Sequence, residues 1–187
     1  MTGTAMLPST LPPTAPVIRR PGFRFMLAHP AHWVALGFGA GLSPVAPGTV
    51  GTLWAWLAFV LLQPRLGSAQ MAGLIAVSAL VGWWACTVTA RHMNVADPGA
   101  IVWDEVIAFW LVLWLVMPTG LWGQLVAFTL FRIFDAAKPG PVAWADQRFK
   151  QRHGQAIGWA QGFGIIFDDL VAALCTLLVI ALWQRLG

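Results

Sequence analysis

From Trp33 to Ala90 the sequence contains a single charged residue, Arg65. The whole chain is 58% hydrophobic and 10% charged, whereas soluble domains usually carry about 25% charged residues. The stretch Leu66–Ala90 alone can cross a bilayer at about 1.5 Å of helix rise per residue. We therefore predict an all-α, polytopic integral membrane protein with about five membrane-crossing helices. The scattered basic residues, with a net charge of +4, fit membrane orientation and not a nucleic-acid surface.

Predominantly apolar segments separated by turn signals define the expected crossings. The first ends before Gln63-Pro64-Arg65, and the others are expected over residues 66–90, 100–117, 121–137 and 163–183. Asp97-Pro98 has the residue types of a helix start, because aspartate caps helices and proline is tolerated at their first position. We expect a polar loop from Lys138-Pro139 to about Gly158.

The first crossing is broken by the stretch "GLSPVAPGTVGT", residues 41–52, which contains two prolines and three glycines. Non-helical backbone is tolerated at membrane depth only where it lines a polar cavity or is buried in protein. Exposed amides ahead of a helix that starts at Thr49–Thr52 would form an anion site. We predict that Pro47, Gly48 and Thr49 bind a phosphate. The alternative is a helix kink or a small-residue contact between helices.

The first 28 residues differ in composition from the rest of the chain. Residues 1–28 contain five prolines and three arginines, which predicts a disordered cytoplasmic tail ahead of a membrane-embedded domain over residues 29–187. With the N-terminus inside, the segments facing the cytoplasm carry Arg19, Arg20, Arg24, Arg91, Lys138, Arg148, Lys150 and Arg152. The outer segments carry only Arg65 and Arg185, so the positive-inside rule favours this orientation.

All seven acidic residues lie between residues 97 and 169. Those within predicted crossings all fall near cytoplasmic ends, and they are Asp104, Glu105, Asp135, Asp168 and Asp169. Three helices therefore bring carboxylates to a similar depth, where an ionised group is expensive unless it is paired or hydrated. Clustered carboxylates repel one another unless a cation neutralises them, and oxygen ligands suit Mg²⁺.

From this pattern we derive candidate site residues. The candidate metal ligands are Asp104, Glu105, Asp168 and Asp169, two adjacent pairs whose members point about 100° apart on a helix. Arg132 and Lys138 are candidate phosphate-binding and catalytic residues, and Asp135 between them is a further catalytic candidate. The structural alternatives are an Arg132–Asp135 ion pair, a helix cap at Asp97 and a solvated surface position for Asp146.

Four blocks in the chain together resemble the phosphatidylglycerophosphatase A family. They are "GFGAGLSPVAPGTVGT" (37–52), "IVWDEVIAFW" (101–110), "FRIFDAAKPGP" (131–141) and "GIIFDDLVA" (164–172). The resemblance implies a Mg²⁺-dependent phosphatase of the bacterial cytoplasmic membrane, with its active site facing the cytoplasm. Its substrate would be phosphatidylglycerophosphate and its product phosphatidylglycerol, a step of phospholipid biosynthesis. The residues that match the family's motifs are Gly48, Thr49, Asp104, Glu105, Arg132, Asp135, Lys138, Asp168 and Asp169.

Hydrolysis of a phosphomonoester requires charge neutralisation, a nucleophile in line and a proton for the leaving alkoxide. Asp135 could serve as a metal ligand, as a base that orients water, or as the nucleophile. The main alternative function is a membrane transporter or ion carrier that uses the acidic cluster as part of a translocation path. Acids gathered at one membrane face disfavour that alternative.

Overall fold

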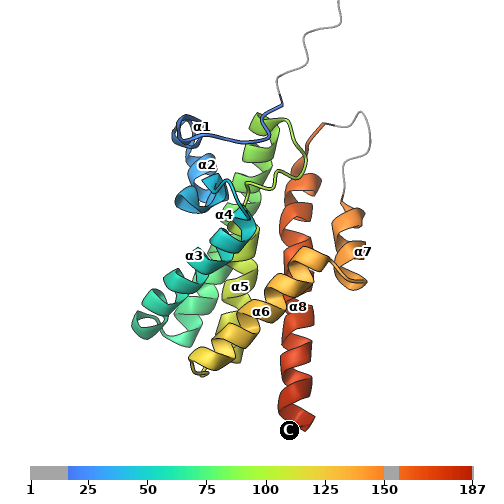
Figure 1. The fold of residues 1–187 in the computed structure, drawn as a ribbon. Helices are drawn as coiled ribbons and strands as arrows, with labels where there is room; N and C mark the ends of the chain where they lie inside the picture. Colours follow the sequence, from blue (N-terminus) through green and yellow to red (C-terminus); the bar gives the residue numbers. More distant parts are fainter. Residues whose placement is uncertain (1–16, 150–155, 187) are drawn as a thin grey trace, which may run out of the picture.

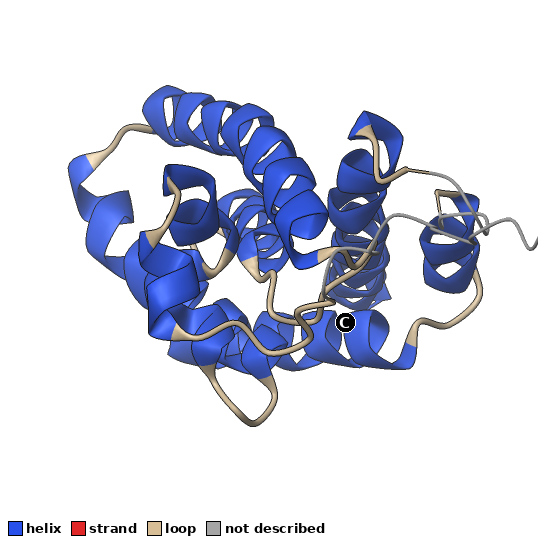
Figure 2. Ribbon diagram, turned by 90° about the horizontal axis from the view of Figure 1, so that it is seen from above, coloured by secondary structure: helices blue, strands red, loops and turns tan. Residues whose placement is uncertain are grey.

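The computed structural model describes residues 17–149 and 156–186. These residues form helices and loops without any strand, which confirms the all-α prediction for this part of the chain (Figure 2). In chain order the elements are α1 (Phe23–Leu27), α2 (Pro30–Ala35), the 3₁₀ helix η1 (Gly37–Leu42), α3 (Pro47–Leu62), the 3₁₀ helix η2 (Gln63–Arg65), α4 (Ser68–Met93), α5 (Trp103–Val116), α6 (Leu121–Ala137), α7 (Pro141–Arg148) and α8 (Trp159–Leu186).

The longer helices run alternately up and down around α5 (Figure 1). Helix α5 packs against α8, α3, α4 and α6, and α8 also packs against α4, α6 and α7. The short helices α1 and α2 lie at one end of the bundle, called here the capped end, and α7 lies on the other side of the bundle, beside α8 (Figure 1). The C-terminus lies at the opposite end, together with the connections between α3 and α4 and between α5 and α6.

Helix α5 is central because its sequence is apolar on all sides. Its largest fully buried side chains include Phe109, Ile107 and Leu113. Two of its tryptophans also donate indole hydrogen bonds to neighbouring helices: Trp103 to the Ser78 carbonyl of α4 at 3.2 Å and Trp110 to the Ala55 carbonyl of α3 at 2.8 Å. These contacts fix α5 in position, and with it the two carboxylates in its first turn.

Two helices, α4 and α8, are long and apolar enough to cross a membrane by length and composition. Helices α3, α5 and α6 occupy the other predicted segments but are shorter, at 16, 14 and 17 residues. The predicted segments are therefore helical in the structure, whereas the number of membrane crossings is not confirmed.

The connection between α4 and α5 differs from the sequence-based prediction. Asp97-Pro98 does not begin a helix, because α5 starts at Trp103 with Val102 as its N-cap. The intervening backbone is held by a turn in which Ile101 N–H donates to the Pro98 carbonyl at 2.9 Å. Val102 N–H then donates to the Ala35 carbonyl of α2 at 2.9 Å. This long-range bond delays the helix, and no local pattern predicts it.

Two further expectations need correction. The predicted loop after α6 contains α7, which begins at Pro141, buries Val142 and Ala145, and uses proline at a position where helices tolerate it. The predicted disordered tail needs correction for residues 17–28, because α1 buries Met26 and the Ile18 N–H donates to the Met93 carbonyl at 2.9 Å. Residues 1–16 of that tail and 150–155 of the loop lie outside the described residues.

Candidate active site

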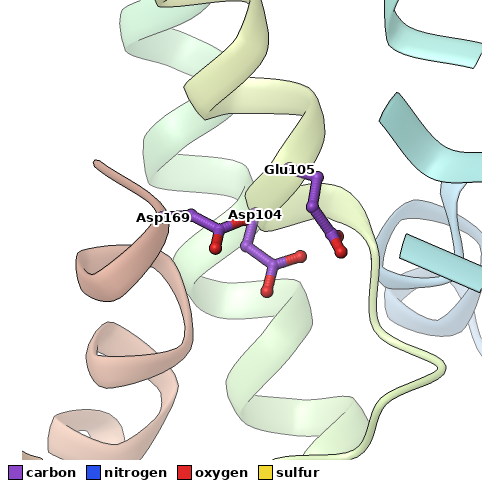
Figure 3. Close-up of side chains that lie close together, drawn as sticks. All are labelled: Asp104, Glu105 and Asp169. Atoms are coloured by element: carbon purple, nitrogen blue, oxygen red, sulfur yellow. The ribbon is translucent and has the colours of Figure 1, made fainter. Parts of the chain in front are cut away.

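Three carboxylates from two helices form an acid cluster, defined as Asp104, Glu105 and Asp169. One ligand oxygen from each lies within 4.8 Å of the other two. Asp104 and Glu105 stand in the first turn of α5, where the helix dipole favours negative charge, and Asp169 comes from α8 (Figure 3). Glu105 is 8% exposed and Asp169 is 3% exposed. Segments more than sixty residues apart in the sequence therefore meet at one buried polar point.

Each residue of the acid cluster has one buried oxygen without a hydrogen-bond partner among the described residues: Asp104 Oδ1, Glu105 Oε2 and Asp169 Oδ2. Buried polar atoms are normally hydrogen-bonded, and an uncompensated buried carboxylate is costlier still. A cation bound between the three oxygens would remove that cost and the mutual repulsion of the carboxylates. Their chemistry fits a hard divalent ion such as Mg²⁺, which prefers oxygen ligands.

Arg132 of α6 connects the acid cluster to two other helices. Its Nη1 lies 3.7 Å from Glu105 Oε1 and donates to Thr52 Oγ1 of α3 at 3.3 Å. It also forms a hydrogen-bonded ion pair with Asp135, one turn further along α6. The ion pair weighed as a structural alternative therefore exists, but it lies within contact distance of the acid cluster.

The segment before α3 contains the predicted break. Backbone φ is positive at Gly37, Phe38 and Gly39 inside η1, and again at Ala46, immediately before the helix. Helix α3 begins at Pro47, two residues before the predicted start at Thr49. The three predicted phosphate-binding residues thus form the first turn of α3.

Gly48 brings the start of α3 against the acid cluster. A Cβ at this position would lie 2.2 Å from Glu105 Oε1 and 3.3 Å from Arg132 Nη2, so only glycine fits without moving a side chain. The first N–H groups of an α-helix have no intrahelical partner, which leaves those of Gly48 and Thr49 available to an anion. Pro47 has no N–H and cannot take the donor role predicted for it.

Lys138 lies at a second polar point, the Lys138 bridge, which consists of Lys138, Asp146 and Asp168. The ammonium Nζ is 2.6 Å from Asp146 Oδ1 of α7 and 2.6 Å from Asp168 Oδ2 of α8. Burial alone would lower the pKa of Lys138, but hydrogen bonds to the two carboxylates raise it above its usual value. Asp146 and Asp168 also line a cavity of about 300 Å³ between α7, α8 and the residues before α5.

The structure thus divides the predicted site residues into two groups. Asp104, Glu105 and Asp169 come together with Arg132, Asp135 and Gly48, whereas Asp168 and Lys138 form the separate bridge. Sequence analysis missed Thr52, whose hydroxyl donates to the Gly48 carbonyl at 2.8 Å and accepts from Arg132. Its spacing of four residues from Gly48 places both on one helix face, and that spacing was the available signal.

Comparison with known proteins adds information on the family. The sequence model described as phosphatidylglycerophosphatase A matches residues 33–184. A phosphatidylglycerophosphatase A of Escherichia coli strain K12 is 39% identical over 155 residues, which cover 81% of this chain and 81% of that protein. The protein of the same name from Haemophilus influenzae strain Rd is 37% identical over 158 residues, covering 84% of this chain and 90% of that protein.

A third relative has a different name. A Bacteroides thetaiotaomicron protein with the provisional name phosphatidylinositol-3-phosphatase is 32% identical over 171 residues, covering 88% of this chain and 96% of that protein. No solved structure matches the chain. All three relatives are named for the removal of phosphate from a phospholipid head group.

Proposed function

The chain belongs to the phosphatidylglycerophosphatase A family and is therefore a phosphatase, and we propose that its substrate is phosphatidylglycerophosphate. Removal of the terminal phosphate gives phosphatidylglycerol, so the reaction would be a step of phospholipid biosynthesis. The observation that carries this proposal is the set of buried, unpartnered carboxylate oxygens beside Arg132. An apolar fold has no structural use for such oxygens, whereas a metal-assisted phosphatase requires them.

Asp104, Glu105 and Asp169 are the residues that would hold Mg²⁺. Bound there, the ion would neutralise charge on the phosphate and hold one of its oxygens. Asp168, the fourth predicted ligand, is left out of this assignment because its Oδ2 bonds Lys138. Its place in the Lys138 bridge makes it a positioning residue for α8, on which Asp169 also stands.

Arg132 and the start of α3 would bind the phosphate oxygens that face away from the carboxylates. Arg132 uses Nη1 for its contacts with Glu105, Asp135 and Thr52, and a guanidinium has five N–H donors in total. Its Nη2 lies close to Gly48, where the amides of Gly48 and Thr49 are also available. These donors would converge on a single anion between α3 and α6.

Asp135 is buried at 9% exposure and paired with Arg132, and we assign it the base that orients the attacking water. In this role it takes the water proton while the phosphorus–oxygen bond to the glycerol breaks, and the leaving alkoxide acquires a proton. Direct attack by Asp135 on phosphorus is the alternative. The two differ in whether a phosphoaspartate forms, so an acid quench with substrate radiolabelled in the terminal phosphate distinguishes them.

Several features support placement in the bacterial cytoplasmic membrane as a multi-pass protein. Trp159 and Trp183 are 48% and 80% exposed and lie about 36 Å apart along α8, a spacing suited to the two interfaces of a bilayer. Large exposed apolar side chains occur on α3, α4 and α8, among them Leu57, Leu80 and Leu178. Lipid contact would explain that exposure. Arg91 and Lys138 lie at the capped end, which would face the cytoplasm under the positive-inside rule.

The direct test is phosphate release by the purified protein from phosphatidylglycerophosphate in uncharged detergent micelles, with Mg²⁺ and after chelation. Activity that needs Mg²⁺ and prefers this lipid supports the proposal. Phosphatidylinositol 3-phosphate is the informative second substrate, because one relative is named for it. Equal or faster phosphate release from phosphatidylinositol 3-phosphate would contradict the proposed substrate. Phosphate release that is unaffected by chelation would contradict the proposed role of Mg²⁺.

The alternative of a transporter or ion carrier has less support. A translocation path requires polar groups along the whole depth of the bundle. The acid cluster instead lies at the level of the first turn of α5, which carries Asp104 and Glu105 and is close to the capped end. The rest of α5 is apolar. Single cysteines introduced along α5 and α8 would be labelled from one side only in the phosphatase, and from both sides in a carrier.

A further inference from the structure

A cavity of about 300 Å³ lies at the capped end and is lined in part by Pro47, the first residue of α3. Its lining comes from three separate segments: the residues before α1, the end of η1 with the loop that follows, and the loop before α5. Arg19 and Arg20 are the only charged side chains in that lining. Ser43 also contributes, although its hydroxyl donates to the Val45 carbonyl at 2.8 Å.

Neither arginine has a carboxylate partner among the described residues. The ion pairs among the described residues all involve Arg132 or Lys138, and none includes Arg19 or Arg20. Arg19 also lines a neighbouring hollow, together with Asp97. Arginine binds phosphate oxygens through paired N–H donors, so a hollow lined by two unpaired arginines suits a phosphate group.

The position of this cavity relates it to the proposed substrate. Pro47 lines the cavity, and the next residue, Gly48, faces Glu105 and Arg132. The Cα atoms of these two consecutive residues are about 3.8 Å apart. Phosphatidylglycerophosphate carries two phosphates, the terminal monoester and an inner diester, which are separated by a three-carbon glycerol. A terminal phosphate at the acid cluster would place the diester close to the first turn of α3.

We propose that Arg19 and Arg20 bind the inner phosphodiester of the lipid substrate in this cavity, and thereby select lipids that carry a second phosphate. The inference rests on the proposed function, since it assumes that the terminal phosphate is bound at the acid cluster. It assigns the arginines a role in substrate binding and none in bond breaking. The glycerol between the two phosphates then lies across the first turn of α3.

The test is the double variant Arg19→Gln/Arg20→Gln in the full-length protein, assayed on phosphatidylglycerophosphate in uncharged detergent micelles. Loss of two charge-assisted contacts should raise KM about tenfold or more and leave kcat within about twofold. Phosphatidylglycerol contains the diester but no monoester, so it should inhibit the wild type and inhibit the double variant about tenfold more weakly. The matched control is Arg24→Gln, an exposed arginine on α1 that does not line the cavity.

Each outcome has a defined meaning. An unchanged KM in the double variant would overturn the inference. A raised KM with undiminished inhibition by phosphatidylglycerol would also overturn it, because the arginines would then bind the terminal phosphate. An equal effect in Arg24→Gln would show general attraction of anionic lipid by surface charge. A wild type that releases no phosphate from phosphatidylglycerophosphate would instead refute the proposed function.

Discussion

Asp168 and Asp169 are adjacent on α8 and chemically identical, yet they belong to different parts of the molecule. Asp168 is 6% exposed and bonds Lys138, which also holds Asp146 of α7. Asp169 is 3% exposed and faces Asp104 and Glu105, with its Oδ2 unpartnered among the described residues. Successive side chains on a helix point about 100° apart, which is enough to direct one toward α6 and α7 and the other toward α5.

The contrast shows that burial alone does not identify a functional carboxylate. In the Lys138 bridge each carboxylate bonds the same ammonium, which ties α6, α7 and α8 together. In the acid cluster, one buried oxygen of each residue has no hydrogen-bond partner among the described residues, and a bound cation is the partner that we propose. The two regions should therefore respond differently to substitution, one mainly in stability and the other mainly in activity.

The largest expected effect separates the two aspartates directly. Asp169→Asn keeps the shape but removes a charged ligand, and phosphate release should fall about 100-fold or more. Asp168→Asn should reduce activity less than about tenfold, because it acts through the placement of α8. Initial rates on phosphatidylglycerophosphate, with membrane insertion checked by fractionation, measure both. Equal losses in the two variants would contradict the division drawn here.

Gly48→Ala should lower activity with little loss of stability. The added Cβ would meet Glu105 Oε1, the end of a flexible side chain, so the protein folds while Glu105 is displaced from the acid cluster. We expect a fall in kcat/KM of about tenfold to 100-fold. The matched control is Gly73→Ala on α4, where a Cβ meets no atom within 4 Å. Comparable activity of the two alanine variants would count against Glu105 as part of the site.

Mg²⁺ should stabilise the wild type against unfolding even in the absence of substrate. Binding to the folded state alone adds about 2.7 kcal/mol at a concentration about 100 times Kd. Asp169→Asn should lose this stabilisation and Asp168→Asn should retain it, because only the former belongs to the acid cluster. Thermal unfolding in detergent, with Ca²⁺-free buffers and a Mg²⁺ series, gives the measurement. If Asp169→Asn retained the Mg²⁺-dependent stabilisation, the ion would have to bind at a site other than the acid cluster.

The smallest expected effect concerns the Lys138 bridge. Lys138→Met leaves Asp146 and Asp168 without their shared cation, and the free energy of unfolding should fall by about 1–3 kcal/mol. Combining it with Asp168→Asn should recover part of that loss, because one uncompensated charge is removed. Denaturation of both variants in detergent tests the coupling. If Lys138→Met abolishes activity at unchanged stability, Lys138 contacts phosphate as its sequence motif suggested.

Much of the fold was predictable because apolar segments and their turn residues are local features. The helices at 47–62, 68–93, 103–116, 121–137 and 159–186 follow the predominantly apolar segments of the sequence. The late start of α5 was not predictable, since it depends on the hydrogen bond from Val102 to Ala35 in a distant helix. Helix α7 had a local signal in Pro141, which was outweighed by the polar character of the segment.

The site was predictable as a gathering of acids but not in its internal division. Because charged residues are scarce in the apolar segments, the sequence itself placed the carboxylates of α5, α6 and α8 near one end of the bundle. A metal site was then predicted because clustered carboxylates repel one another unless a cation is bound. The sequence could not show that Asp168 turns toward Lys138, because helix rotation depends on packing against neighbours. The same limit applies to Gly48, whose closeness to Glu105 depends on how α3 approaches α5.

Under the proposed membrane placement, the unequal lengths of the helices have a consequence for the surrounding lipid. Helix α8 measures about 42 Å, whereas α3 measures about 24 Å, less than the roughly 30 Å of a bilayer's hydrocarbon core. A bilayer adapts to such mismatch by thinning beside the short element. Lipids next to α3 would then sit deeper than their neighbours, with their head groups lowered toward Gly48 and Arg132. By deforming the leaflet, the protein would bring the lipid head group to the site, and the substrate would not have to leave the leaflet.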